Sequence, residues 1–214
     1  MIRIERGKTV AVLGQKGTGK TYLCRQIAEA IPKDVIVFDT IGALKPKGVR
    51  IYEVDIKDLD KQAVLFSQLT LRTHRNIGVD FSRLTKDEIV YFTNAYLSIT
   101  PLKQKYLIVD EMADYTPQIG DSSKELERLI RHGRNVGDTF IFNTQRPAYL
   151  TKNVISLVDV AVFFRLVWKR DIDVVKDLLN NLGLRNITSE IREITNLKTG
   201  QFKIYKFGNS TTTS

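Results

Sequence analysis

The stretch Gly14-Gln15-Lys16-Gly17-Thr18-Gly19-Lys20-Thr21 decides the fold of this 214-residue chain. It satisfies the pattern G-x-x-x-x-G-K-[ST] at every fixed position. Its glycines allow the backbone to curl around an anion with the N–H groups pointing inward. The apolar run 9–13 before it predicts a buried strand, and the helical spacing of Leu23, Ile27 and Ile31 after it predicts a helix. This context favours a phosphate-binding loop over a glycine-rich turn that matches by chance.

We expect the loop to bind ATP together with Mg²⁺. All eight residues of 14–21 are candidate nucleotide contacts. The ammonium group of Lys20 can reach the β- and γ-phosphates, and the hydroxyl of Thr21 can coordinate Mg²⁺. The helix that begins at Lys20 adds the positive end of its dipole.

Two carboxylates follow another predicted strand. Residues 106–109 are apolar and lead directly into Asp110 and Glu111. This is the pattern of a Walker B segment, in which Asp110 would hold Mg²⁺ through its water shell and Glu111 would act as general base. Adjacent carboxylates after a strand also occur by accident, but beside a phosphate loop they favour a hydrolase over a passive nucleotide binder. The absence of an Asn-Lys-x-Asp motif argues against a GTPase, and a small-molecule kinase remains an alternative.

Strands and helices alternate through most of the chain. Apolar runs predict further strands at 35–38, 49–54, 77–80, 139–142, 160–164 and 202–207, and helical patterns lie between many of them. This alternation implies an α/β fold with a central, mainly parallel sheet flanked by helices on both faces. Together with the phosphate loop and the Asp110–Glu111 pair, we expect a P-loop NTPase fold of the RecA/ASCE type. We expect a single domain over residues 1–208 and a flexible tail over 209–214.

Capping signals predict where several helices begin and end. Thr85 and Glu88 form a Thr-x-x-Glu capping box, and Ser122 with Glu125 is expected to cap the helix that runs through Ile130. A helix is expected at 59–74, and another at 172–182 that ends at Gly183.

Composition restricts the partners and the compartment. The net charge of +9 favours acidic partners such as nucleic acid or anionic lipid, although a generally basic surface is an equal alternative. The one cysteine, Cys24, falls in a predicted helix and is expected to be a buried thiol. The sequence shows neither the apolar core of a signal peptide nor a run of roughly 18 to 20 apolar residues. We therefore expect a soluble, intracellular protein without a dedicated zinc site.

The segment 131–147 reads Arg-His-Gly-Arg-Asn-Val-Gly-Asp-Thr-Phe-Ile-Phe-Asn-Thr-Gln-Arg-Pro. It resembles the FtsK/HerA superfamily of DNA-pumping ATPases, in which an Arg-x-x-Gly precedes a strand that ends in Thr-Gln-Arg-Pro. Arg134 and Gly137 match the first part, and 144–147 match the second. The resemblance extends over about residues 9–167.

The resemblance implies roles for two further residues. Gln145 would lie near the γ-phosphate and sense hydrolysis. Arg134 is similar to the arginine finger that the family supplies from a neighbouring subunit, which implies a ring, usually hexameric; Arg131 is the second candidate. A polar strand-end residue and a surface arginine are the respective alternatives. Asp39 matches an acidic position of the family, but Thr40 and Ile41 depart from its pattern, so a strand-end cap is at least as good an interpretation.

Candidate DNA contacts lie on one predicted helix. Lys124, Arg128 and Arg131 are spaced i, i+4, i+7 and share a face that could follow a phosphate backbone without reading sequence. Because the same helix contains acidic residues, a solvated helix face is an equal alternative. A loop contains a second basic group, formed by Lys45, Lys47 and Arg50.

These features together predict an ATP-hydrolysing motor that translocates double-stranded DNA and packages a viral genome into a capsid. The resemblance to compact packaging ATPases of membrane-containing viruses implies location in the host cytoplasm or with the virion, and docking on a capsid vertex or a membrane protein. One alternative is a cellular HerA-like or conjugation-type DNA-translocating ATPase. The other is a nucleotide-gated assembly factor that does not hydrolyse ATP.

Overall fold

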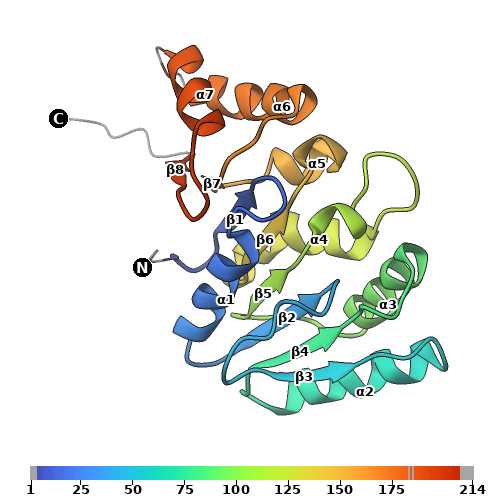
Figure 1. Ribbon diagram of the computed structural model, residues 1–214. Helices are drawn as coiled ribbons and strands as arrows, with labels where there is room; N and C mark the ends of the chain where they lie inside the picture. Colours follow the sequence, from blue (N-terminus) through green and yellow to red (C-terminus); the bar gives the residue numbers. More distant parts are fainter. Residues whose placement is uncertain (1–3, 183, 185, 208–214) are drawn as a thin grey trace.

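The structure is a computed structural model that describes residues 4–182, 184 and 186–207. The predicted tail at 209–214 and the predicted helix end at Gly183 lie outside the described residues. Within the described part, eight strands form one sheet (Figure 1). The strands are β1 Thr9–Leu13, β2 Val35–Asp39, β3 Arg50–Glu53, β4 Ile77–Asp80, β5 Tyr106–Val109, β6 Thr139–Thr144, β7 Val160–Phe163 and β8 Lys203–Lys206. The helices are α1 Lys20–Ala30, α2 Leu59–Arg72, α3 Lys86–Ser98, α4 Lys124–His132, α5 Lys152–Ile155, α6 Lys169–Asn180 and α7 Ile187–Thr195.

The strand order is β3-β4-β2-β5-β6-β1-β7-β8. The described pairings are parallel except that of β8, which runs antiparallel to β7. In β1, Thr9 pairs with Phe140 and Leu13 pairs with Thr144 of β6. The carboxyl ends of β5, β6 and β1 therefore lie side by side at one edge of the sheet. The predicted α/β fold with a mainly parallel sheet is confirmed.

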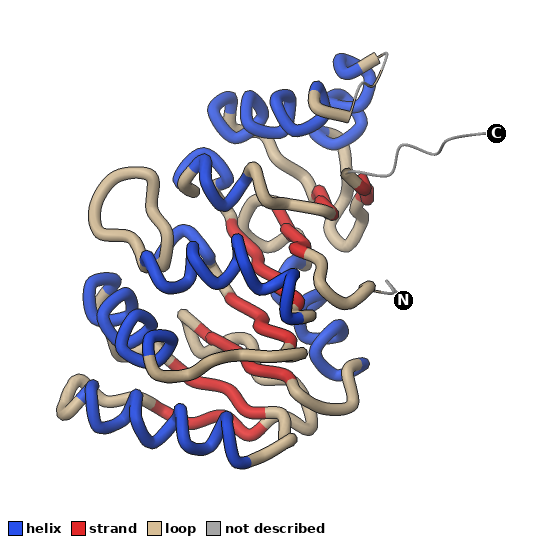
Figure 2. The backbone as a smooth tube through the Cα atoms, turned by 180° about the vertical axis from the view of Figure 1, so that it is seen from behind, coloured by secondary structure: helices blue, strands red, loops and turns tan. Residues whose placement is uncertain are grey.

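Helices cover both faces of the sheet, but unequally. Val10 and Val12 of β1 belong to the core cluster that contains the buried residues of α1. Ala11 and Leu13 face the opposite side, where the larger core cluster takes in buried residues of α2 to α7. Both faces of β1 are thus buried, as its continuous apolar sequence requires. Figure 1 shows α1 in front of the strands, and Figure 2 shows helices lining the opposite face.

Local signals gave the helix boundaries with mixed success. The capping box of α3 is confirmed: the Thr85 hydroxyl accepts from the backbone N–H of Glu88, and the Thr85 N–H donates to the Glu88 carboxylate at 2.7 Å. The predicted Ser122 cap is wrong by one residue. Ser123 caps α4 by accepting from the backbone N–H of Leu126, whereas the Ser122 hydroxyl donates to Glu127.

The carboxyl-terminal helices differ most from the sequence prediction. α6 begins at Lys169, three residues before the predicted start, and α7 was not predicted. The spacing of Ile187, Ile191 and Ile194 is helical and contained the missing signal, since Ile194 is buried and the other two pack against the larger core cluster. None of the helices described here is both long and apolar enough to cross a membrane.

Candidate functional site

The phosphate loop joins the end of β1 to the start of α1. Gly17 and Gly19 have φ angles of 78° and 111°, which side-chain-bearing residues rarely adopt. Neighbouring backbone holds the loop in place: the Gly14 N–H donates to the Thr144 carbonyl at 3.3 Å, and the Gln15 N–H donates to the Arg165 carbonyl at 2.9 Å. The loop therefore has the backbone shape that an anion requires, and its first two residues are held by the end of β6 and by the segment that follows β7.

Lys20 is the cation of this loop. Its side chain is buried, and its ammonium group donates to the carbonyl of Gln15 at 2.9 Å. Burial lowers the pKa of Lys20, and the nearby Glu111 and Asp110 carboxylates oppose that shift. A phosphate group would supply the counter-charge that a buried ammonium lacks.

Thr21 and Asp110 lie where the sequence predicts the magnesium ligands. The Thr21 hydroxyl donates to Asp110 Oδ1 at 3.4 Å, across the contact between α1 and the end of β5. Burial raises the pKa of Asp110, and hydrogen bonds from Asn143 and Thr21 oppose it. A hydroxyl and a carboxylate are oxygen ligands that Mg²⁺ accepts in phosphate loops, so these residues fit the ion.

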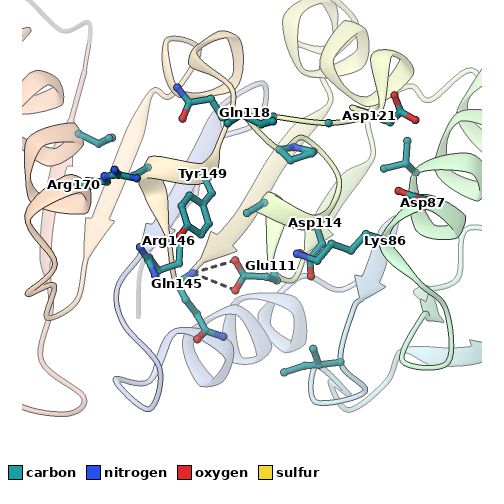
Figure 3. Close-up of a pocket in the computed structure, with 18 of the residues that line it drawn as sticks. Lys86, Asp87, Glu111, Asp114, Gln118, Asp121, Gln145, Arg146, Tyr149 and Arg170 are labelled. Carbon is teal, nitrogen blue, oxygen red and sulfur yellow. Dashed lines mark hydrogen bonds and ion pairs between the residues drawn. The ribbon is translucent and has the colours of Figure 1, made fainter.

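Glu111 follows Asp110 in a left-handed backbone conformation, with φ 49° and ψ 64°. Its carboxylate accepts from the Thr144 hydroxyl at 2.6 Å and from the backbone N–H of Gln145 at 3.2 Å, as Figure 3 shows for the second contact. Burial raises the pKa of Glu111, and these two donors oppose the shift. A non-glycine residue with positive φ at this position indicates that the surrounding contacts hold it there.

Asn143 connects the two carboxylate residues, and the sequence analysis missed it. Its amide nitrogen donates to Asp110 Oδ1 at 2.5 Å, and its amide oxygen accepts from the backbone N–H of Glu111 at 3.1 Å. The signal was an asparagine directly after the predicted buried strand 139–142, which in the structure extends to Thr144, because a buried amide side chain needs hydrogen-bond partners. Thr144, which holds the Glu111 carboxylate, was also missed as a side-chain contact.

A cavity of about 950 Å³ adjoins Glu111 and Gln145. Figure 3 shows Arg146, Tyr149 and Arg170 on one side of it and Asp114 with Lys86 on the other. No residue of 14–21 is among the described residues that line the cavity. The space lies next to the predicted base and sensor rather than around the phosphate loop.

Arg134 lies at the opposite edge of the sheet from the phosphate loop. It precedes β6, whose six residues run from that edge to Glu111, and its guanidinium is exposed with Asp159 at 3.9 Å. A strand of this length spans about 17 Å. The structure therefore brings Lys20, Asp110, Glu111 and Gln145 to one edge, and it does not bring Arg134 to them. Arg131 is also exposed, at the end of α4.

The other charged candidates have local partners. Asp39 accepts from the backbone N–H groups of Ala43 and Leu44 at 3.0 and 2.9 Å, which is the geometry of a strand-end cap. Arg128 pairs with Glu125 at 2.7 Å, whereas Lys124 and Arg131 are exposed on α4.

In the second basic group, Lys45 pairs with Asp80 at 3.1 Å. The Arg50 guanidinium lies over the Tyr52 ring, 5.2 Å from its centroid, and Lys47 is exposed.

Comparison with known proteins supports the fold and its class. A family model described as an AAA domain matches residues 3–146. The genome packaging NTPase B204 from Sulfolobus turreted icosahedral virus 2, in complex with AMPPCP, superimposes with a TM-score of 0.63 at 17% identity, covering 94% of this chain and 92% of that one. VirB4 of Thermoanaerobacter pseudethanolicus superimposes with a TM-score of 0.63 at 10% identity, covering 95% of this chain and 90% of VirB4. The pCW3 conjugation coupling protein TcpA superimposes with a TM-score of 0.51 at 16% identity, covering 97% of this chain and 59% of TcpA. No curated protein sequence matches the chain.

The likeness to these three structures is one of fold. The expected resemblance to FtsK/HerA-type ATPases is confirmed at that level.

Proposed function

The chain belongs to the AAA domain family of P-loop NTPases, and from this premise we propose that it is an ATP-hydrolysing motor that moves double-stranded DNA. The observation that carries the proposal is the meeting of three strand ends. The phosphate loop after β1, the Asp110–Glu111 pair after β5 and the polar end of β6 are joined by direct hydrogen bonds. That all eight described strands join one sheet supports treating residues 1–208 as a single motor domain.

Each residue of the site has a distinct role in the transfer of the γ-phosphoryl group to water. The loop N–H groups and Lys20 hold the triphosphate. Glu111 accepts a proton from the water whose oxygen attacks the γ-phosphorus, while the bond from that phosphorus to the departing ADP oxygen breaks. Bound Mg²⁺, held by Thr21 and Asp110, would neutralise charge on the phosphates. Burial favours this role of Glu111, because a raised pKa makes its carboxylate a stronger base.

We propose that the site is completed by a neighbouring subunit. Gln145 lies beside Glu111 and can report the state of the phosphate through its amide. Arg134 cannot reach its own phosphate loop, since the length of β6 separates them, but it is exposed and available to another copy. A ring, hexameric by analogy with the family, would place one copy's Arg134 against the next copy's nucleotide.

DNA is the proposed cargo, bound without sequence recognition. The net charge of +9 favours a polyanion, and two-way coverage above 90% with a genome packaging NTPase supports packaging into a capsid. Conjugation is the second candidate, because the pCW3 conjugation coupling protein TcpA matches the fold with a TM-score of 0.51. The neighbouring genes discriminate: capsid genes favour packaging with docking at a capsid vertex or membrane protein, and pilus genes favour conjugation.

The test is ATP hydrolysis by the purified chain with and without double-stranded DNA. We expect DNA to increase phosphate release, and we expect Lys20→Ala and Glu111→Gln to lower it by about 100-fold or more. Glu111→Gln should retain ATP binding, because it removes the base without touching the loop. Tight ATP binding with no phosphate release from the wild-type chain, even with DNA, would instead indicate a non-hydrolysing assembly factor.

A further inference from the structure

An aromatic and basic surface lies beside the predicted site and has no role in the proposed hydrolysis of ATP. It consists of Arg146, Tyr149, Trp168, Lys169 and Arg170, which we call the Trp168 patch. The first two residues follow β6, and the other three lie at the start of α6. Arg146, Tyr149 and Arg170 appear together at one side of the cavity in Figure 3. The patch is therefore composed of two segments far apart in sequence.

The aromatic rings of the patch are exposed and held in place. Trp168, the one tryptophan of the chain, is 61% exposed, and Tyr149 is 46% exposed. The Arg146 guanidinium lies 4.5 Å from the Tyr149 ring centroid and 5.4 Å from that of Trp168. Tyrosine and tryptophan are enriched at binding interfaces, because each presents a large apolar ring together with a polar group.

A buried carboxylate fixes the arginine that organises these rings. Asp171 is 0% exposed; it accepts from Arg146 Nε at 3.1 Å and from the backbone N–H of Ala148 at 3.1 Å. Because this contact neutralises Arg146, the net charge of the patch comes from Lys169 and Arg170. Both are exposed, and neither joins an ion pair among the described residues, although Asp173 lines the same cavity as Arg170.

Partly exposed aromatic rings, next to cations that join no ion pair among the described residues, match the chemistry of a nucleic acid strand with unpaired bases. Nucleobases stack on aromatic rings whatever their sequence, and phosphates bind neighbouring Lys and Arg side chains. The basic face of α4, formed by Lys124, Arg128 and Arg131, has cations without aromatic rings, and its Arg128 is already paired with Glu125. We propose that the Trp168 patch binds an unpaired stretch of the DNA that the motor moves, such as an open end. The inference rests on the proposed function, because it assumes that DNA is the cargo.

The patch is connected to the predicted base through consecutive residues. Gln145, whose backbone N–H bonds to the Glu111 carboxylate, directly precedes Arg146, and the Arg146 N–H donates to the Thr144 hydroxyl at 3.2 Å. A DNA strand bound to the Trp168 patch would thus lie against the segment that holds the Glu111 carboxylate. Single-stranded DNA should therefore change the rate of ATP hydrolysis as well as bind.

The test measures fluorescence anisotropy of a labelled oligothymidylate of about 16 nucleotides, and of a blunt duplex of the same length, with the full chain. Loss of one stacked base is expected to weaken single-strand binding by about 5- to 150-fold in Trp168→Ala, and much less in Trp168→Phe. Lys169→Gln, at an exposed position, should weaken the same binding and lower its salt dependence by about 0.7 in the log–log slope. The matched control is Lys61→Gln, an exposed position on α2 outside the candidate DNA contacts, which removes the same charge and should leave single-strand binding within about twofold.

Each outcome decides between the two proposals. Unchanged single-strand affinity in Trp168→Ala and Lys169→Gln, with wild-type binding intact, would overturn the patch and leave the DNA motor standing; a protein partner would then be the better occupant. Equal losses on single strand and blunt duplex would overturn the assignment to unpaired bases. The proposed function itself would be overturned if the wild-type chain bound neither the single strand nor the duplex and if neither changed its rate of ATP hydrolysis. Cooperative thermal unfolding of each variant shows that it is folded.

Discussion

Replacing Asn143 by alanine should remove the link between the two carboxylate residues of the site. The substitution deletes the donor to Asp110 Oδ1 at 2.5 Å and the acceptor for the Glu111 N–H at 3.1 Å. A hydrogen bond to an ionised group contributes about 1.5 to 3 kcal/mol, and a buried N–H left without a partner costs about 1 to 3 kcal/mol. These terms overlap, so we expect the free energy of unfolding to fall by about 3 kcal/mol.

The effect on catalysis should exceed the effect on nucleotide affinity. Without Asn143 the backbone of Glu111 loses the bond that accompanies its positive φ, so the carboxylate is expected to shift relative to the water it activates. A displacement of about 1 Å can cost about 100-fold in rate. We expect kcat to fall by about that factor while the Kd for ATP changes less than about threefold, because the phosphate loop keeps its own contacts.

Steady-state phosphate release gives kcat, equilibrium titration with a fluorescent ATP analogue gives Kd, and thermal denaturation gives stability. Asn153→Ala is the matched control, since Asn153 is exposed and its amide bonds only to Glu127 among described groups. Asn143→Asp keeps the size but places a carboxylate 2.5 Å from Asp110, so it should be more damaging than alanine at neutral pH. A folded Asn143→Ala protein with wild-type kcat would refute the positioning role.

Three further predictions concern other parts of the chain. Arg134→Ala should lose about 10³-fold in rate alone and recover when mixed with Lys20→Ala, since each supplies what the other lacks; no recovery in mixed assemblies would contradict a shared site. Burial raises the pKa of Asp138 to about 6 from 3.8, so the fold favours its protonated form, and stability of about 3 kcal/mol is lost as pH rises from about 4 through 6. Asp138→Asn should therefore raise the melting temperature at pH 8 and not at pH 4; an equal shift at both would refute this origin. Gly14→Ala should abolish ATP binding, because a Cβ there would lie 2.5 Å from Cβ of Phe164, and near-normal affinity would show that the loop can move aside.

The sequence was sufficient for features whose cause is local. The phosphate loop, the Asp110–Glu111 pair and the capping box of α3 each depend on a few adjacent residues with a fixed backbone requirement. The buried strands could be predicted from their continuous apolar runs, which arise because helices cover both faces of the sheet. The sequence did not predict that Ser123 rather than Ser122 caps α4, because this depends on where the preceding loop enters the helix.

Contacts across the sheet were the part that sequence could not supply. Asn143 meets Asp110 and Glu111 only because β5 and β6 are neighbours in the strand order, although 33 residues separate Asn143 from Asp110. The Trp168 patch has the same origin, since Asp171 joins Arg146 from 25 residues away. Neither pairing leaves a periodic or spacing signal in the chain.

The parallel register also restricts how the site can be completed. Lys20 and Glu111 lie at the carboxyl edge of the sheet, and Arg134 precedes the amino end of β6, which is hydrogen-bonded to β1 along its length. No side-chain rotation moves Arg134 across a buried strand, and sliding β6 against β1 would break the central pairing of the core. If Arg134 acts on a phosphate site of this kind, that site must therefore belong to another chain. Among the arginines near Glu111, the guanidinium of Arg146 is already engaged by buried Asp171, whereas Arg170 lines the cavity beside Glu111 without an ion pair among the described residues. Under our proposal that Arg134 is the finger, assembly is the step that completes the catalytic site.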